Sequence, residues 1–518
     1  MNSNNNAIMA CLLCLGLETL AATAAPAAAP MTTQAAPAAS ASAPDTAKWL
    51  GEWTGVEHES SGNFRGEALF DLEIRATPTG LELLDKDRQL GNAPPAPLAI
   101  NGNEFTTELH GLWPAPIKVT GRLAPDGQTI DLVRSGAGMT GTESHRATLR
   151  HDDPSARKYL SPRVTSAGTR DLDCHSTAPK PTADRIPVAS LQAVNIDPTA
   201  LAGLMQSICA ESGKSDERQT ESVLILRHGK LVFEEYFWGQ TAANPHVISS
   251  STKSVTSIIT GIAVERGKLK PDATVASYFP DRTNSLWVRE KYPITVRNAL
   301  SMSSGTAWDD SVKGAAIPSA QLLESHDVVG YMLDKPSIHP AGAIYNYDNG
   351  LPALMGDLVA RVTGEPFDRF AAENLFKPMN ITNYRWTIMR DGSVLAAGGF
   401  YMLPRDMAKI GQMMLNRGRW EGRQIVSSAW VTESTRQQSA PDQYPYGFYW
   451  HLTNAQHRHV QGADGYMALG QGGQVIAVFP TLDLVVVTTS QNWHSPGLTA
   501  MPFDLFDKYI LPAVTSPP

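Results

Sequence analysis

The sequence predicts an α+β protein: an antiparallel β-sheet flanked by helices, with a mostly helical inserted subdomain, preceded by a small all-β barrel or sandwich. Short alternating strand patterns fill residues 46–150. Two hairpin patterns, at 222–237 and 475–491, are separated by a long stretch of mostly helical periodicity. A chain of 518 residues, 42% of them hydrophobic, can build more than one core.

The first 45 residues have the composition of an export signal and a linker. The apolar run 7–25 ends in small residues with an A-x-A pattern, so residues 1–25 are expected to be a cleaved signal peptide, although the leader carries no Lys or Arg. Glu18 leaves too short an apolar run to span a membrane. Residues 26–45 are an Ala/Pro-rich linker. The mature protein is therefore expected to be periplasmic or secreted, with no integral membrane span.

Residues 46–150 form the predicted all-β domain. Their strand patterns are short and are divided by Gly, Pro, Asn and Asp, which is typical of a small antiparallel barrel or sandwich. The opening "WLGEWTG", with Gly51 and Trp53, resembles the G-x-W start of lipocalin-like barrels. A ligand cavity and a docking or spacer role both stay open for this domain, and its partner is unknown.

The rest of the chain divides into a connector and one large domain. Residues 151–190 are rich in Pro, Ser, Thr and charge and are expected to connect the two domains, and residues 191–518 are long enough for one α/β-type domain. Its first hairpin should turn at His228 and Gly229, and its second around Pro480 to Asp483. If the hairpins share a sheet, a cleft forms where the helices meet it.

The stretch "SSSTKSVTS", residues 249–257, contains a candidate nucleophile. The apolar residues after Ser250 recur at helical spacing, so the serines lie in the first turn of a helix, where backbone N–H groups are unpaired. Ser250 and Lys253 are three residues apart and share a face. A partly buried, neutral lysine can take the serine proton, and the Ser250 N–H can help bind an oxyanion. A second S-x-x-K, from Ser155 to Lys158, lies in the connector without such a helix and is discarded.

Two further segments carry candidate partners of this pair. Tyr347 precedes a helix for which Asn349 is the predicted N-cap, so the phenol can relay a proton and the amide can donate to substrate or to Lys253. In "ALGQGGQVIAVFP", Gly472 and Gly473 are expected to enter a strand along which an extended substrate can lie, with the Gln474 N–H as second oxyanion donor. A packed aromatic with a cap, and a glycine-rich bulge, are the alternatives without function.

These three motifs, in this order, resemble the serine β-lactamase and penicillin-binding-protein superfamily, above all class C β-lactamases and their esterase and 6-aminohexanoate-dimer hydrolase relatives. The resemblance covers most of residues 195–515. It implies that Ser250 is acylated, that Lys253 and Tyr347 transfer protons with Asn349 in support, and that water deacylates the enzyme.

One departure from that family bears on the substrate. The family usually presents Lys-Thr-Gly on its third strand, whereas the aligned triplet here is Gln471, Gly472 and Gly473, without a cation. This favours a small ester or linear amide substrate over a β-lactam. A β-lactamase or D-alanyl-D-alanine carboxypeptidase, and a non-catalytic binding protein, stay as alternatives.

The charge distribution and the absence of metal-binding motifs in the sequence argue against a nucleic-acid-binding protein and a metalloenzyme. The net charge of −8 arises from scattered charges without basic blocks, so nucleic acid is not expected as a partner. The sequence has no zinc-protease motif, and "HRH" at 457–459 has no visible further ligands, so neither a metal nor a cofactor is expected. After signal cleavage Cys174 and Cys209 remain, either as a disulfide or as two separate thiols.

Overall fold

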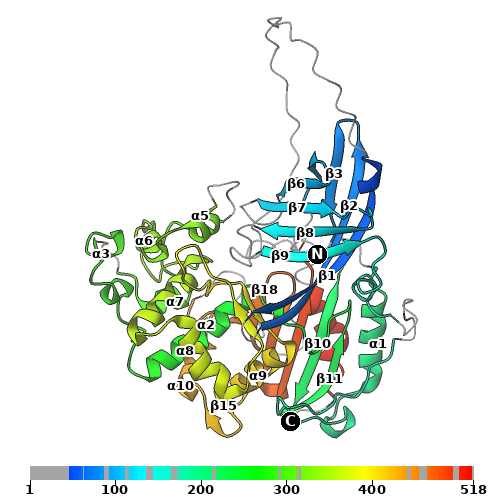
Figure 1. Ribbon diagram of the computed structural model, residues 1–518. Helices are drawn as coiled ribbons and strands as arrows, with labels where there is room; N and C mark the ends of the chain where they lie inside the picture. The colour runs from blue at the N-terminus through cyan, green and yellow to red at the C-terminus, as the bar shows by residue number, and fades with distance from the viewer. Residues whose placement is uncertain are drawn as a thin grey trace, which may run out of the picture.

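The computed structural model describes residues 46–515 with internal gaps (Figure 1). The gaps are 62–63, 87–92, 111–115, 136–143, 165–170, 172–173, 213–217, 290–292, 311, 313–316, 440–444, 454–463 and 494–500. The predicted signal peptide and linker, and the "HRH" stretch, lie outside the described residues.

A nine-stranded antiparallel sheet, here called the β domain, forms the N-terminal part of the structure. Its strand order is β4-β3-β2-β1-β9-β8-β7-β6-β5. The two edges meet, because β4 and β5 follow each other in the chain and the Thr107 hydroxyl on β6 donates to the Pro97 carbonyl on β4 (2.9 Å). The strands are β1 (Gly51–Ser61), β2 (Phe64–Thr77), β3 (Gly80–Asp85), β4 (Ala96–Pro97), β5 (Ala99–Asn101), β6 (Glu104–Leu109), β7 (Ile117–Leu123), β8 (Thr129–Ser135) and β9 (Ser144–Arg150).

Alternation of buried and exposed residues places the core inside this curled sheet. In β6 every second side chain is buried, which is the pattern of a strand with one face in a core. Trp49 and Trp53 are fully buried there, and the Trp53 indole N–H donates to the Trp49 carbonyl (2.9 Å). The predicted small all-β domain is confirmed.

The α+β part, from Leu191 onward, is organised around a six-stranded antiparallel sheet. The order is β11-β10-β20-β19-β18-β17, so both predicted hairpins lie in one sheet, as expected. The turn at His228 and Gly229 uses positive φ angles of 51° and 69°, and Asp483 turns the second hairpin at 46°. The strands are β10 (Thr220–Arg227), β11 (Lys230–Tyr236), β17 (His451–Thr453), β18 (Gly465–Gly470), β19 (Gln474–Phe479) and β20 (Leu484–Ser490).

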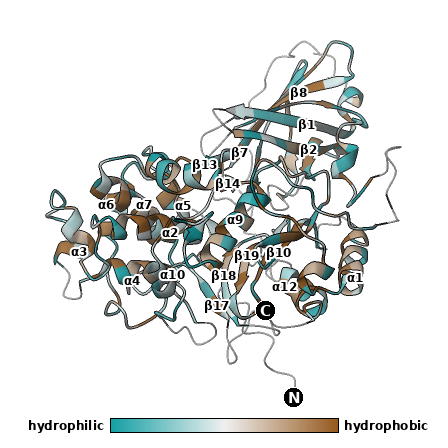
Figure 2. Cartoon of the chain, turned by 90° about the horizontal axis from the view of Figure 1, so that it is seen from below, coloured by the Kyte–Doolittle hydropathy of each residue, from teal (hydrophilic) through white to brown (hydrophobic). Residues whose placement is uncertain are grey.

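Helices cover both faces of this sheet, and Figures 1 and 2 show the layers. Val223 and Ile225 on β10 belong to the cluster that contains α1 (Pro198–Cys209) and α12 (Met501–Leu505), whereas Leu224 and Leu226 face the cluster of α2 (Ser251–Glu265) and α9 (Pro404–Leu415). Because neighbouring strand residues point to opposite faces, a continuous apolar strand serves two cores.

The predicted helical insertion lies between β11 and β17 and also carries two small sheets. One has the order β12-β14-β13 and the other pairs β15 with β16. The elements are β12 (His246–Val247), α3 (Leu286–Arg289), α4 (Val296–Leu300), α5 (Pro318–Glu324), α6 (Val328–Leu333), α7 (Gly350–Thr363), α8 (Phe367–Ala371), β13 (Tyr384–Trp386), β14 (Phe400–Met402), β15 (Arg419–Trp420), β16 (Arg423–Gln424) and α10 (Ser428–Ser434).

The described part of the 151–190 segment runs along the edge of the large sheet. Val188 bridges Leu231 of β11, and Arg405 at the start of α9 pairs with Asp184 (3.0 Å). The structure joins Cys174 to Cys209 at the end of α1 by a disulfide with a Cα–Cα distance of 6.3 Å. No helix among the described residues is long and apolar enough to cross a membrane.

Candidate active site

Ser250 lies at the N-terminus of α2, in a tight turn that presents it to solvent. Ser249, the residue before it, is held at a φ of 46°, a conformation that costs energy for a non-glycine residue and is concentrated at functional sites. Ser250 occupies the N-cap position, but its side chain makes no capping hydrogen bond and is half-buried. Its hydroxyl is therefore not used to stabilise the helix.

Lys253 is directed at that hydroxyl. Its Nζ donates to Ser250 Oγ (2.9 Å) and to the Ala397 carbonyl (2.7 Å), and the residue is 2% exposed. Burial lowers the pKa of Lys253 from 10.5 to about 7, against the opposing effect of Asp310 and Asp348. A lysine with this pKa is substantially neutral at physiological pH and can accept a proton.

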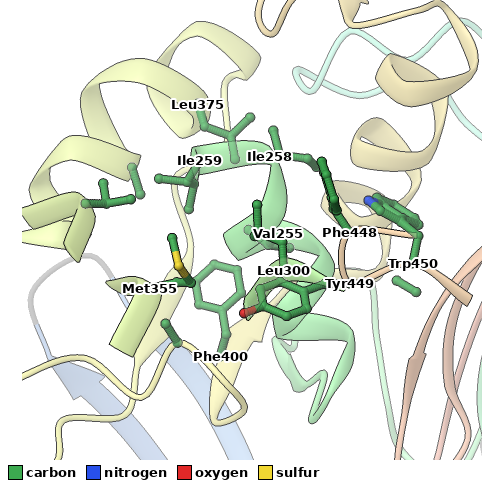
Figure 3. Packing of buried hydrophobic residues seen from close by; sticks show 14 of the residues in the cluster. Val255, Ile258, Ile259, Leu300, Met355, Leu375, Phe400, Phe448, Tyr449 and Trp450 are labelled. Atoms are coloured by element: carbon green, nitrogen blue, oxygen red, sulfur yellow. The ribbon is translucent and has the colours of Figure 1, made fainter. Parts of the chain in front are cut away.

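The helix that carries the pair is fixed from several sides. Its apolar face, with Val255, Ile258 and Ile259, packs into the larger core (Figure 3). Hydroxyls of its polar face donate to backbone carbonyls: Ser251 to Gln474 (3.0 Å) and Thr256 to Ala396 (2.8 Å). Such buried contacts hold the first turn in register with the sheet and with the loop before β14.

Tyr347 joins the serine and the lysine, as the sequence predicts. The Lys253 Nζ lies 4.9 Å from the centre of the Tyr347 ring, and the residue is half-buried on the loop just before α7. Three side chains from two segments that are far apart in the sequence thus lie close together.

Asn349 is the N-cap residue of α7 by position, but its side chain acts elsewhere. Its amide nitrogen donates to Asp310 (2.9 Å) and Ser319 (3.1 Å) instead of Lys253, and no side-chain capping bond is present. The cap comes from Asp348, whose Oδ1 accepts from the backbone N–H of Gly350 (2.7 Å). Of the two predicted roles, the contact with Lys253 is not the one the structure has, because the amide donates to the Asp310 carboxylate, and donation to substrate stays a prediction.

Asp310 and Asp348 are charged neighbours that the sequence reasoning missed. Asp348 is fully buried, and burial raises its pKa to about 7, while the Thr306 hydroxyl donates to its second oxygen (3.1 Å). Both carboxylates raise the pKa of Lys253. The sequence offers a signal in hindsight, since Asp348 stands between Tyr347 and Asn349 at a helix start.

The glycine-rich segment has a different shape from the one predicted. Gly472 and Gly473 have φ angles of 85° and 92° and lie in the turn that joins β18 to β19, where Gly470 pairs with Gln474. The expectation that they enter an extended strand for substrate is wrong, because positive φ values bend the chain. Gln471 lies in the same turn and is partly exposed.

This turn nevertheless borders the serine. A Cβ at Gly470 would lie 2.3 Å from the Ile248 carbonyl oxygen, two residues before Ser250, so only glycine allows this approach. Gln474 is fully buried, its side chain bonds to Ser490, and its carbonyl accepts from Ser251. Its N–H as an oxyanion donor stays a prediction.

The discarded second motif has a structural role. Ser155 donates to Asp153 within the connector (2.8 Å), and Lys158 pairs with Glu67 of β2 (2.8 Å), so Lys158 joins the connector to the β domain. The described residues contain no cluster of three His, Cys, Asp or Glu side chains that could hold a metal ion.

Comparisons with known proteins agree with this geometry. The Beta-lactamase family profile matches residues 205–505. The 6-aminohexanoate-dimer hydrolase of Paenarthrobacter ureafaciens is 23% identical over 307 residues, which cover 54% of this chain and 74% of that protein. A candidate D-alanyl-D-alanine carboxypeptidase of Escherichia coli O157:H7 is 23% identical over 345 residues, covering 53% and 79%.

A solved structure shows the same fold. A candidate 6-aminohexanoate-dimer hydrolase from Bacillus anthracis has a TM-score of 0.51 at 19% identity, covering 64% of this chain and 89% of that one. The β domain lies outside the family match, which begins at residue 205. The family match spans more than half of the chain and agrees with the fold, so this protein belongs to the beta-lactamase family of serine hydrolases.

Proposed function

We propose that this enzyme cleaves carboxylic esters or linear amides through an acyl-enzyme on Ser250, with Lys253 and Tyr347 as proton-transfer groups. The observation that carries the proposal is the Lys253 to Ser250 contact of 2.9 Å, combined with burial that lowers the pKa of Lys253 to about 7. A serine hydroxyl becomes a nucleophile when an adjacent neutral base takes its proton.

The reaction proceeds in two halves. Ser250 Oγ attacks the carbonyl carbon while its proton passes to Lys253, and the oxyanion is stabilised by the Ser250 N–H and a backbone N–H of the turn Gly470–Gln474. The leaving alcohol or amine receives a proton through Lys253 and Tyr347. Water then attacks the acyl-enzyme, gives its proton to the same pair, and releases the acid and free Ser250.

Two observations favour esters and linear amides over β-lactams. Strand β18 and the following turn, residues 465–474, contain no Lys or Arg that could pair with the carboxylate of a β-lactam. The relative from Paenarthrobacter is named as a hydrolase of the 6-aminohexanoate dimer, a linear amide. Gln471, Gly472 and Asn349 are proposed to border the substrate rather than to react with it.

The substrate class is tested with a matched panel of p-nitrophenyl esters, the 6-aminohexanoate dimer and a chromogenic cephalosporin. We expect turnover of the ester or the dimer with a kcat/KM at least about tenfold above that for the cephalosporin, and no turnover of any of them by Ser250→Ala. Faster hydrolysis of the cephalosporin would contradict the proposal and favour the β-lactamase or carboxypeptidase alternative.

We also propose that the protein is exported, as the composition of residues 1–25 suggests. The Cys174–Cys209 disulfide supports this, because disulfides persist mainly in oxidising compartments. The N-terminal sequence of protein recovered outside the cytoplasm tests it, and a retained Met1 would argue against cleavage.

A further inference from the structure

The small sheet β12-β14-β13 has one face in the core and one face toward the β domain. Arg385 pairs with Tyr401, which pairs with Val247, so these three side chains form a row on one face. Their neighbours Trp386 and Phe400 are buried on the other face, with ring centres 4.0 Å apart. Figure 2 shows β13 and β14 at the boundary between the two parts of the molecule.

The hairpin β1–β2 of the β domain covers the outer row. The Phe64 ring meets the Tyr401 ring edge to face, with centres 5.9 Å apart. The Arg385 guanidinium lies 4.5 Å from the centres of both rings and forms an ion pair with Glu59 of β1. The Arg385 side chain is only 10% exposed, so this ion pair is shielded from the water that weakens surface pairs.

Hydrogen bonds from one side chain to backbone groups extend the same interface. The side chain of Asn383, just before β13, accepts from the Arg65 N–H (2.9 Å) and donates to the Arg65 carbonyl (2.9 Å). Its amide also donates to the carbonyl of Ala243 (3.3 Å), on the segment that leads into β12. One asparagine thus ties β2 to both sides of the small sheet.

The covered sheet holds the catalytic pair. The Ile248 N–H, two residues before Ser250, donates to the Phe400 carbonyl of β14 (2.9 Å). The Ala397 carbonyl that accepts from Lys253 stands three residues before Phe400. A displacement of β14 would therefore move the serine loop and the lysine acceptor together.

We propose that the β1–β2 hairpin positions Ser250 and Lys253 through this sheet, with Arg385 as the positioning residue, so that the β domain is a working part of the active site. The inference rests on the proposed function. If the β domain served only to bind a partner, it would still need this interface, but changes in the interface would not alter the rate of the reaction at Ser250.

The test compares Glu59→Gln, Arg385→Gln and the double variant in the full chain. For p-nitrophenyl ester hydrolysis we expect each single change to lower kcat about tenfold with KM changed less than about twofold, because small displacements of reacting groups are costly. The double variant should be no slower than the slower single variant, since both changes remove one ion pair. Fluorophosphonate labelling of Ser250 should slow in parallel.

Arg390→Gln is the matched control. Arg390 pairs with Glu324 of α5, and both side chains are largely exposed, so an exposed pair of little energetic weight is removed and kcat should stay that of the wild type. A kcat within about twofold of the wild type in Glu59→Gln, or an effect confined to KM or Tm, would overturn the inference. Glu59→Gln keeps the side-chain size and so separates positioning from folding. If the wild type itself is not labelled, the proposed function fails instead.

Discussion

Lys253 balances two opposing influences. Its burial favours the neutral amine, while Asp310 and Asp348 favour the cation, and the result is a pKa of about 7. The S-x-x-K spacing was sufficient to predict the contact with Ser250, because residues three apart on a helix are neighbours. The two carboxylates could not be predicted, since they reach the lysine only through the fold.

The activity should follow the charge of Lys253. Because only the neutral amine accepts a proton, kcat/KM for an ester should rise with pH and level off above about 7. Below that pKa it should fall about tenfold per pH unit. A pH–rate profile of the wild type and Lys253→Ala checks this, and the same acid limb in both proteins would exclude Lys253 as the base.

The stability should change with pH in the same interval. The folded-state pKa lies below the unfolded value of 10.5, so the unfolded chain binds more protons here between about 7 and 10.5. The contribution of Lys253 to the free energy of unfolding therefore rises with pH across that window and is lowest below about pH 7. Lys253→Met should accordingly raise Tm at pH 7 while abolishing turnover.

The turn between β18 and β19, next to the serine loop, is an element whose conformation the sequence pattern does not determine. The hairpins, the α2 periodicity and its end near Gly267 follow from local rules, and the structure has them. The glycines at 472 and 473 are compatible with either a bare strand or a turn, because glycine lacks the Cβ that restricts φ. The pairing of Gly470 with Gln474 in the folded sheet places these two glycines in a turn.

Gly470→Ala tests how closely that strand end must approach. An added Cβ would meet the Ile248 carbonyl at 2.3 Å, so β18 must move away from the serine loop. We expect kcat for an ester to fall by about tenfold or more, and the free energy of unfolding to fall by about 1–3 kcal/mol. Gly203→Ala is the control, because its Cβ meets only the Tyr509 ring, at 3.0 Å. Wild-type kcat in Gly470→Ala would argue against this contact.

At the scale of the whole molecule, the described part of the 151–190 segment packs against the large domain and is not a flexible linker. The disulfide attaches it to α1, the Arg405 to Asp184 pair attaches it to α9, and the bridge of Val188 to Leu231 attaches it to the edge strand β11. Its composition predicts a connector, but a composition gives no information on long-range pairing. The division into two folded parts was predictable from the change in strand texture, whereas the interface between them was not.

Loss of the disulfide should lower stability more than activity. The cross-link joins residues separated by 35 positions, and both cysteines belong to the core on the face of the large sheet opposite to α2. Cys174→Ser with Cys209→Ser should lower the free energy of unfolding by about 2–4 kcal/mol, because the unfolded chain gains freedom. Thermal unfolding measures this, and the ester kcat at 25 °C should be unchanged. An equal Tm with and without the disulfide would show that the other contacts suffice.

The mass of the intact protein after reaction with a fluorophosphonate ester tests the central claim most directly. We predict one phosphonyl adduct per chain, located by peptide mapping on Ser250, and no adduct in Ser250→Ala. Labelling should slow as the pH falls below about 7, in step with protonation of Lys253. An adduct on another residue, or an unmodified but folded wild-type protein, would contradict a Ser250 acyl-enzyme.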